Sequence, residues 1–212
     1  MEALNENAAL FESVKDCVKD YMTRYDASHD FYHILRVLGM AKLILAETQE
    51  EGRQGLDETA VFLAALLHDI GDHKYAQPGE DVENQIAKLL VERGASPTLA
   101  AKVQTIAINV SYSTESKNPV AFRAVLDRHP ELAIVQDADR LDSLGAAGIA
   151  RTFVYTGAKR ADMKDAIAHF DEKLVKLEGM MKTTAGKRLA AERTRRIREY
   201  QSWWRDECGQ TF

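Results

Sequence analysis

The stretch AALLHDIGDHKY, residues 64–75, joins apolar helix formers directly to a histidine, a carboxylate and a glycine. Together with the preceding residues it forms the apolar run AVFLAALL, residues 60–67, which is typical of a buried helix. A carboxylate at the end of such a helix needs a cation or strong donors, because burying it alone is costly. A metal ion would satisfy His68 and Asp69 together, since imidazole and carboxylate are common metal ligands. A core histidine satisfied by its neighbours is the alternative for His68.

Helical patterns dominate the rest of the chain, and strand patterns are almost absent. Ser28, Asp57 and Ser96 precede three of the predicted helices as caps. The one β-like run, LAIVQDA (132–138), is too isolated to pair with another strand. The sequence therefore predicts an all-α fold. The predicted helices span residues 4–23, 30–49, 57–70, 81–93, 97–111, 120–127, 131–157, 162–180 and 184–207.

Composition and charge limit the classes of partner. The chain has 212 residues, of which 45% are hydrophobic, enough for one domain with a sizeable core over 1–212. Its formal net charge of −5 does not indicate a nucleic-acid polymer as partner. The longest apolar run is far shorter than the roughly 20 residues that cross a bilayer, so no membrane association is expected. The two cysteines stand in no metal or disulfide spacing, and we expect a cytoplasmic protein.

The last predicted helix is mostly polar and carries an apolar stripe. We expect this stripe to dock on the body of the same chain, and a contact in a homodimer is the alternative. The stripe consists of Leu189, Ile197, Tyr200 and Trp204.

A second histidine lies on another predicted helix, in the block SHDFYHILRV, residues 28–37. At 100° per residue, His33 shares a face with Val37 and Ile44, so its side chain should point inward. His29 lies one turn earlier on nearly the same face. It either joins a site or caps the helix start next to Asp30.

Three aspartates fall in the block IVQDADRLDSLGAAGIAR, residues 134–151. Asp139 and Asp142 are three residues apart and would share a helical face, whereas Asp137 would lie on another. Gly145 and Gly148 indicate close helix packing rather than a solvated surface. At least one of the aspartates should therefore be buried and need a partner.

In this order, His33, His68-Asp69 and Asp139 make an H…HD…D pattern, which resembles the HD-domain superfamily of metal-dependent phosphohydrolases. Four blocks, from SHDFYHILRV to HFDEKLVKLEGMMKTTAGKRLAAERT, resemble a bacterial family of about this length. Some of its members are thought to be nucleotide pyrophosphohydrolases, and the resemblance runs from about residue 20 to 205. It implies a helical bundle with a core of about 20–157 and C-terminal helices of about 160–207 packed on it.

The resemblance also implies roles for individual residues. His33, His68, Asp69 and Asp139 would be the metal ligands, and Asp137 would orient a ligand or close a helix turn. Asp72 would be the general acid/base, with a loop aspartate bonded to backbone as the alternative. The predicted phosphate- and substrate-binding residues are Lys74, Arg140, Arg36, His29 and Arg151. For two of them, Arg36 and Arg151, a salt bridge within the protein is the alternative.

The reaction that this resemblance favours is hydrolysis of a (d)NTP to a (d)NMP and pyrophosphate with one divalent metal ion. Manganese is the first choice, with Mg, Co, Ni, Fe or Zn as alternatives. The substrate would be a small phosphorylated molecule. A 5′-nucleotidase or phosphomonoesterase is the nearest alternative, and a non-catalytic nucleotide or metal sensor is another. The segment 113–131 is longer than the usual connection in the family, and it either covers the pocket or decorates the surface.

Overall fold

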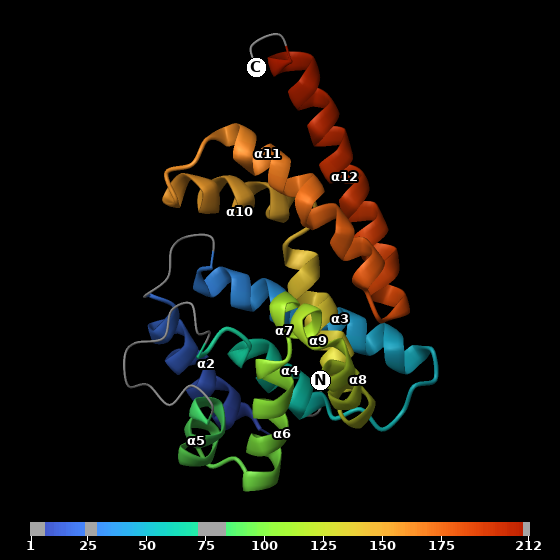
Figure 1. Cartoon of the computed structure of the whole chain (residues 1–212). Coiled ribbons are helices and arrows are strands. Elements are labelled where there is room, and N and C mark those ends of the chain that lie inside the picture. The colour runs from blue at the N-terminus through green and yellow to red at the C-terminus, as the bar shows by residue number, and fades with distance from the viewer. Residues whose placement is uncertain (1–6, 24–28, 72–83, 210–212) are drawn as a thin grey trace.

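The computed structural model describes residues 7–23, 29–71 and 84–209, and every regular element in these ranges is a helix (Figure 1). This confirms the predicted all-α class. The elements are α2 (Ala8–Met22), α3 (Phe31–Glu50), α4 (Glu58–Leu67), α5 (Gln85–Glu92), α6 (Pro97–Ile108), α7 (Tyr112–Lys117), α8 (Pro119–Arg128), α9 (Glu131–Asp142), α10 (Gly145–Ala158), α11 (Met163–Glu172), the 3-10 helix η1 (Leu174–Met180) and α12 (Thr184–Cys208). None of the described helices has both the length and the apolar composition needed to cross a membrane.

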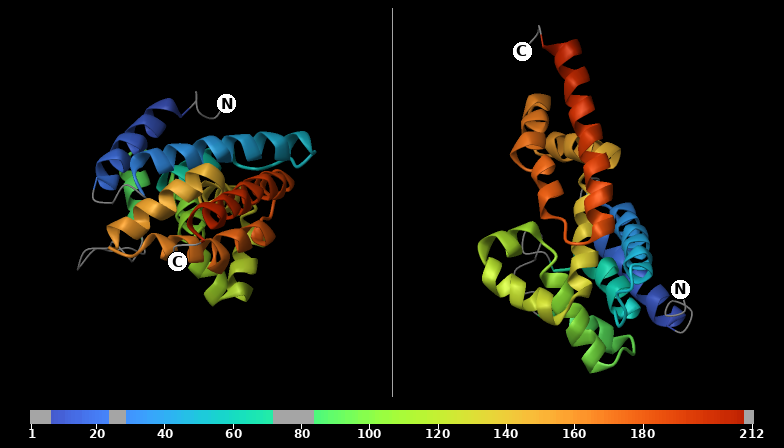
Figure 2. Two further views of the ribbon diagram at one scale, coloured as in Figure 1. Left: turned by 90° about the horizontal axis from the view of Figure 1, so that it is seen from above. Right: turned by 90° about the vertical axis from the view of Figure 1, so that its right-hand side faces the viewer.

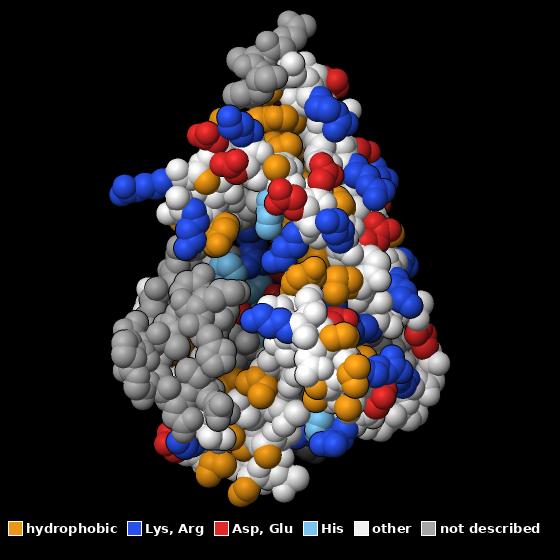
Figure 3. Space-filling model, in the orientation of Figure 1, with side chains coloured by type: hydrophobic (Ala, Val, Ile, Leu, Met, Phe, Trp, Pro, Cys, Tyr) orange, Lys and Arg blue, Asp and Glu red, His pale blue; other side chains and the backbone are white. Residues whose placement is uncertain are grey.

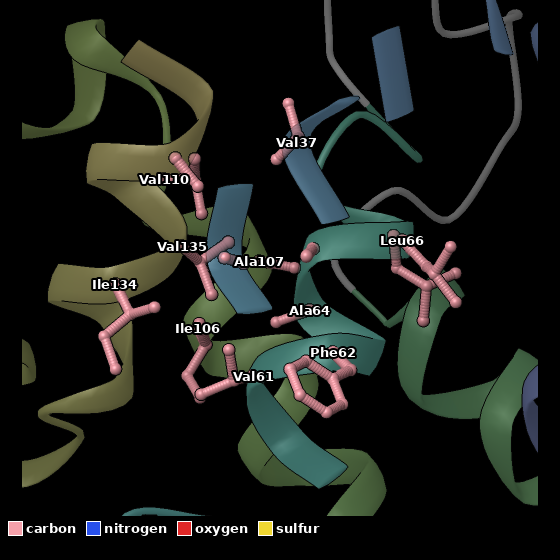
Figure 4. Packing of buried hydrophobic residues seen from close by; sticks show 14 of the residues in the cluster. Val37, Val61, Phe62, Ala64, Leu66, Ile106, Ala107, Val110, Ile134 and Val135 are labelled. Carbon is pink, nitrogen blue, oxygen red and sulfur yellow. The ribbon is translucent and has the colours of Figure 1, made fainter. Parts of the chain in front are cut away.

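Helix α4 lies at the centre of the core. Its residues from Ala60 to Leu67 are all buried, as expected of a helix that is apolar on every side. It packs against α2, α3, α6 and α9. Figure 4 shows part of this contact, where Val61 and Ala64 of α4 lie near Ile106 of α6 and Val135 of α9. Each large aliphatic side chain buried in this way contributes about 1.5–3 kcal/mol. The core thereby fixes the end of α4, where His68 and Asp69 follow.

The C-terminal helices α10, α11 and α12 stand together above this core (Figures 1 and 2). Ile197 is fully buried, and Leu189 and Tyr200 pack against the core cluster. Phe153 of α10 packs its ring against those of Tyr200 and Trp204 at centroid distances of 6.0 and 6.1 Å. The predicted apolar stripe of the last helix therefore docks on the chain's own body.

The predicted helix 131–157 is wrong in one respect, because the chain breaks it into α9 and α10. Leu144 is extended and Gly145 has a φ of +68°, a conformation that favours glycine. A Cβ on Gly148 would lie 2.2 Å from the Ser143 carbonyl oxygen, so this turn requires the small residue. The predicted close packing at both glycines is confirmed. The helix breaks because α10 must turn away from α9 to meet α11 and α12.

Other boundaries also differ from the sequence-based prediction. The predicted helix 162–180 divides at Lys173 into α11 and η1. Asp57 and Ser96 cap their helices as predicted, whereas the cap of α3 is Asp30. Ser28, the predicted cap, lies outside the described residues. The run LAIVQDA belongs to α9.

The segment 113–131 contains most of α7 and all of α8. Within α8 only Phe122 is buried, and no residue of α7 is. Glu115 of α7 nevertheless bonds to the body of the molecule, as described below.

Candidate metal centre

Three helices bring the predicted metal ligands together. His33 lies in the first turn of α3, where the Asp30 carboxylate accepts a hydrogen bond from the His33 backbone N–H at 2.9 Å. His68 follows the last residue of α4 and Asp69 comes next in the chain. Asp139 lies on α9. Because these helices meet in the core, residues up to 106 positions apart in sequence converge at one place.

The donor atoms of these residues lie close to one another. The Nε2 atoms of His33 and His68 are 3.2 Å apart. His33 Nε2 lies 3.4 Å from an Asp69 oxygen and 3.6 Å from an Asp139 oxygen. His68 Nε2 lies 3.5 and 3.7 Å from oxygens of the same two carboxylates. Each of the two carboxylates thus lies within 3.7 Å of both imidazole nitrogens.

These distances fit a single divalent ion. Ligands at about 2.1 Å from one ion lie roughly 3.0 Å apart in octahedral and roughly 3.4 Å apart in tetrahedral geometry. His33, His68 and Asp139 each offer a donor atom within 4.8 Å of the others. Two neutral imidazoles and two carboxylates also balance the charge of a dication. The donor set therefore suits a divalent metal ion.

The cluster is enclosed on the histidine side and open on the carboxylate side. The side chains of His33 and His68 are 1% and 2% exposed, whereas those of Asp69 and Asp139 are 17% and 27% exposed. Figure 3 shows a hollow in this face of the molecule, in which histidine and basic side chains gather. A small charged molecule could reach the carboxylate side of the cluster.

Mutual charge shifts the pKa of every member. Burial alone would lower the pKa of His33, but its hydrogen bonds with Asp142 and Asp69 outweigh burial and raise it. Burial likewise opposes protonation of His68, yet the Asp69 and Asp139 carboxylates raise its pKa to about 9. Although burial favours their neutral forms, the histidines hold the pKa of Asp69 and of Asp139 below the usual range. Without a metal, attraction between the histidines and the carboxylates therefore holds the cluster together.

Asp142 is a member of the site to which the sequence reasoning gave no role. Its Oδ2 lies 2.7 Å from His33 Nδ1, on the opposite side of the ring from the cluster. Arg36 bonds to both Asp142 oxygens, at 2.7 and 3.0 Å, and Arg151 lies 2.9 Å from Oδ2. The sequence signal was present, since Asp142 is three residues after Asp139 and shares its helical face. The alternative of a salt bridge for Arg36 and Arg151 is what the structure shows.

The structure places Arg140 elsewhere. Its side chain is 3% exposed, donates to the Met180 carbonyl at 3.0 Å and lies 2.5 Å from Glu115 Oε2. Arg140 thus ties α9 to η1 and α7, and its guanidinium is engaged there. We therefore correct its assignment from phosphate binding to helix packing.

Asp137 lies on the same side of α9 as Arg140. It is fully buried and accepts hydrogen bonds from the backbone N–H groups of Lys182 and Thr183, at 3.0 and 2.8 Å. The Thr183 hydroxyl donates to it as well, at 2.8 Å. Asp137 was predicted either to orient a metal ligand or to close a helix turn. Its contacts are those of the second role, at the start of α12. Gly186 makes this approach feasible, because a Cβ there would lie 2.3 Å from an Asp137 oxygen.

His29 remains close to the cluster. Its ring centroid lies 5.9 Å from that of His33, and the side chain is partly buried. Burial lowers the pKa of His29, against the opposing effect of Asp69. Asp72 and Lys74, the predicted acid/base and phosphate-binding residue, lie outside the described residues.

Comparison with known proteins agrees with the site geometry. The chain matches the family model of the HD domain over residues 30–144. It is 33% identical over 189 residues to the uncharacterised protein YpgQ of Bacillus subtilis, which covers 86% of this chain and 85% of YpgQ. The crystal structure of YpgQ in complex with ADP is similar to the structure of this chain, with a TM-score of 0.71 and 29% identity. The match covers 98% of this chain and 97% of the YpgQ chain.

A crystal structure of an HD-superfamily hydrolase from Bacillus thuringiensis is also similar. The TM-score is 0.67 at 31% identity, and the match covers 94% of this chain and 96% of that one. The matched family region contains His33, His68, Asp69 and Asp139, whose donor atoms converge in the fold. The chain therefore belongs to the HD-domain superfamily.

Proposed function

We propose that the protein is a metal-dependent phosphohydrolase that cleaves (deoxy)nucleoside triphosphates to monophosphates and pyrophosphate. The observation that carries the proposal is the convergence of two carboxylates on two imidazole nitrogens, with N–N and N–O distances of 3.2–3.7 Å, at the open side of a buried cluster. Such a donor set leaves positions on a six-coordinate ion for water and a phosphate oxygen. A purely structural cluster would have no need of an open side.

His33, His68, Asp69 and Asp139 would hold the ion. When bound, a divalent ion lowers the pKa of a coordinated water and offsets charge on a phosphoryl group. The protein must still deliver and remove protons. We assign this role to Asp72, which follows the HD pair by three residues. Gly71, with a φ of +76°, turns the chain directly before it.

Cations would bind the phosphates of the substrate. Lys74 is the first choice, because it comes two residues after Asp72. His29 lies next to the cluster and could donate to a phosphate oxygen. Arg151 is a further candidate, because its side chain lies beside Asp142 and is 14% exposed. A nucleotide as the phosphorylated ligand is supported by the relative YpgQ, which was crystallised in complex with ADP.

The test is product release from a nucleotide panel by metal-stripped protein to which Mn²⁺, Mg²⁺, Co²⁺ or Ni²⁺ is added back. We expect metal-dependent pyrophosphate release from triphosphates, which His68→Ala abolishes. His169→Ala is the matched control, since this histidine lies on α11 and the charges that act on it are Lys173 and Glu172 rather than members of the cluster. Orthophosphate from monophosphates would instead identify a nucleotidase. A bound ion without any product would identify a sensor or a substrate outside nucleotides.

Asp72→Asn separates an enzyme from a binding protein. We expect turnover to fall by about 10²–10⁴-fold, the usual contribution of a positioned acid/base, while metal and nucleotide still bind. Asp127→Asn, at an exposed aspartate of α8, serves as the control for charge loss. Unchanged turnover of Asp72→Asn would remove this residue from the mechanism.

A further inference from the structure

We propose that Asp142 is a positioning residue, which holds the His33 ring through Nδ1 so that Nε2 faces the metal ligands. Arg36 and Arg151 hold Asp142 in turn. The inference rests on the proposed metal site and adds a chain of contacts behind it. The chain runs from the arginines through the carboxylate and the imidazole to the cluster.

The contacts account for both oxygens of Asp142. Oδ2 lies 2.7 Å from His33 Nδ1 and 2.9 Å from an Arg151 nitrogen. Oδ1 accepts from Arg36 Nε at 2.7 Å, and the second Arg36 contact, at 3.0 Å, reaches Oδ2. The Asp142 side chain is 5% exposed. Little water competes for these bonds, so the carboxylate has one well-defined orientation.

This orientation determines which nitrogen of His33 can bind a metal. An ionised carboxylate only accepts hydrogen bonds, so Nδ1 must carry the proton that faces Asp142. The lone pair of the neutral ring then lies on Nε2, which is 3.4 Å from Asp69 and 3.6 Å from Asp139. A partner on the far ring nitrogen commonly fixes the tautomer and orientation of a metal-binding histidine.

The second histidine is held in a different way. His68 Nδ1 lies 2.9 Å from the carbonyl oxygen of Ala65, three residues earlier in the same segment. That partner is neutral and local, so the Nδ1 side of the His68 ring is held within its own segment. The partner of His33 is a charged side chain from another helix. The orientation of His33 therefore depends on how α9 and α10 sit against α3.

The two arginines offset the cost of burying the Asp142 carboxylate, and they come from two different helices. Arg36 lies one turn after His33 on α3, and Arg151 lies on α10. A buried carboxylate paired with only an imidazole would be less firmly ionised. The ion pairs thus join α3, α9 and α10 around one side chain. A purely structural role in joining these helices is the competing explanation, and the following experiment separates the two.

A matched control lies on the same helix. Asp137 is also a buried aspartate of α9, but its partners are the start of α12 rather than a metal ligand. We would compare Asp142→Asn with Asp137→Asn by calorimetric titration of metal-stripped protein with Mn²⁺ and by the visible spectrum of bound Co²⁺. We expect Asp142→Asn to bind Mn²⁺ about 10–100-fold more weakly and to change the Co²⁺ spectrum. Asp137→Asn should bind within about twofold of the wild type, whatever its stability.

Wild-type affinity and spectrum in Asp142→Asn would overturn the inference, and so would an equal loss in both variants. If Asp142→Asn does not fold, Arg36→Gln takes its place, because the Arg36 side chain is 41% exposed and its loss should be tolerated. That variant should weaken Mn²⁺ binding in the same direction, and unchanged binding would again contradict us.

A measurement without metal distinguishes this inference from the function itself. In the metal-free protein, proton NMR should show a strongly downfield Nδ1 proton of His33 that disappears in Asp142→Asn and persists in Asp137→Asn. If wild-type protein binds no metal, the proposed function fails, whereas this signal still tests the contact. If metal binds and the signal is absent, only the role of Asp142 fails.

Discussion

Helix α9 presents two pairs of charged residues to two different regions of the molecule. Asp139 and Asp142 face α3 and the end of α4, where they meet His33 and His68. Asp137 and Arg140 face η1, α7 and the start of α12. Both pairs are spaced by three residues, so each shares one helical face.

The difference between the two faces lies in their partners. On the structural face, Asp137 accepts from backbone N–H groups and Arg140 pairs with Glu115, so the contacts serve packing. On the metal face, each carboxylate lies within 3.7 Å of both imidazole nitrogens, and the carboxylates stay partly exposed. Buried charge alone therefore does not identify a site. A candidate metal site is indicated when several possible metal ligands converge and remain partly accessible.

The largest effect should come from Asp139→Ala, on the metal face. Removing one of four ligands should lower Mn²⁺ affinity by roughly a thousandfold or more, beyond the 10–100-fold typical of outer partners. Nucleotide hydrolysis should fall to background. At pH values below about 9, the thermal midpoint of the metal-free protein should also fall, because the favourable interaction of Asp139 with His68, which lowers the Asp139 pKa, is lost. Titration calorimetry and thermal unfolding would check this, and a retained Mn²⁺ affinity would contradict it.

Asp137→Ala should act on stability alone. It leaves the buried N–H groups of Lys182 and Thr183 without their acceptor, at about 1–3 kcal/mol each. We expect a loss of about 3 kcal/mol in the free energy of unfolding, or about 6–12 °C in the midpoint for a chain of this size. Denaturant and thermal unfolding would measure it.

The same Asp137→Ala protein should keep its Mn²⁺ affinity and its turnover per folded molecule at temperatures well below the midpoint. A loss of metal affinity with no loss of stability would mean that the two faces of α9 are not separate.

A smaller effect concerns pH. The pKa of His68 is raised to about 9 and that of His33 is also raised, so both stabilise the metal-free fold below pH 6.5. This contribution is lost as pH rises towards about 9. The carboxylates of Asp69, Asp139 and Asp142 have lowered pKa values, so their stabilising contribution is constant across this window and is lost only in acid.

Metal binding should show the reverse trend. The ligands must lose protons, so apparent Mn²⁺ affinity should rise about tenfold per pH unit for each proton released between pH 6.5 and 9. The metal-free protein should unfold at a lower temperature at pH 9 than at pH 6.5, and added Mn²⁺ should stabilise it more at pH 9. Unfolding curves at the two pH values would show this. His68→Ala should flatten both trends.

The sequence alone determined the helical class and most helix positions, because these depend on local pattern: apolar periodicity and caps such as Asp57 and Ser96. The polar interruption at His68-Asp69 pointed to a site, and the resemblance to the HD-domain superfamily supplied the four predicted metal ligands. The glycines at 145 and 148 also predicted close packing. They did not predict the break between α9 and α10, because a break depends on what these two helices pack against.

Only the tertiary structure decided the partners of the remaining charges. Arg36, Arg140 and Arg151 lie next to motif residues in the sequence, and all three were predicted to bind phosphate, with a salt bridge as the alternative for Arg36 and Arg151. In the fold, Arg140 meets Glu115 across 25 residues of chain, and Arg36 meets Asp142 across 106. Such pairs are set by how helices sit against one another, which no local spacing encodes. For the same reason the sequence could show only that at least one of the three aspartates would be buried with a partner. The packing of α9 on α3 gave Asp142 the far side of His33 as its partner.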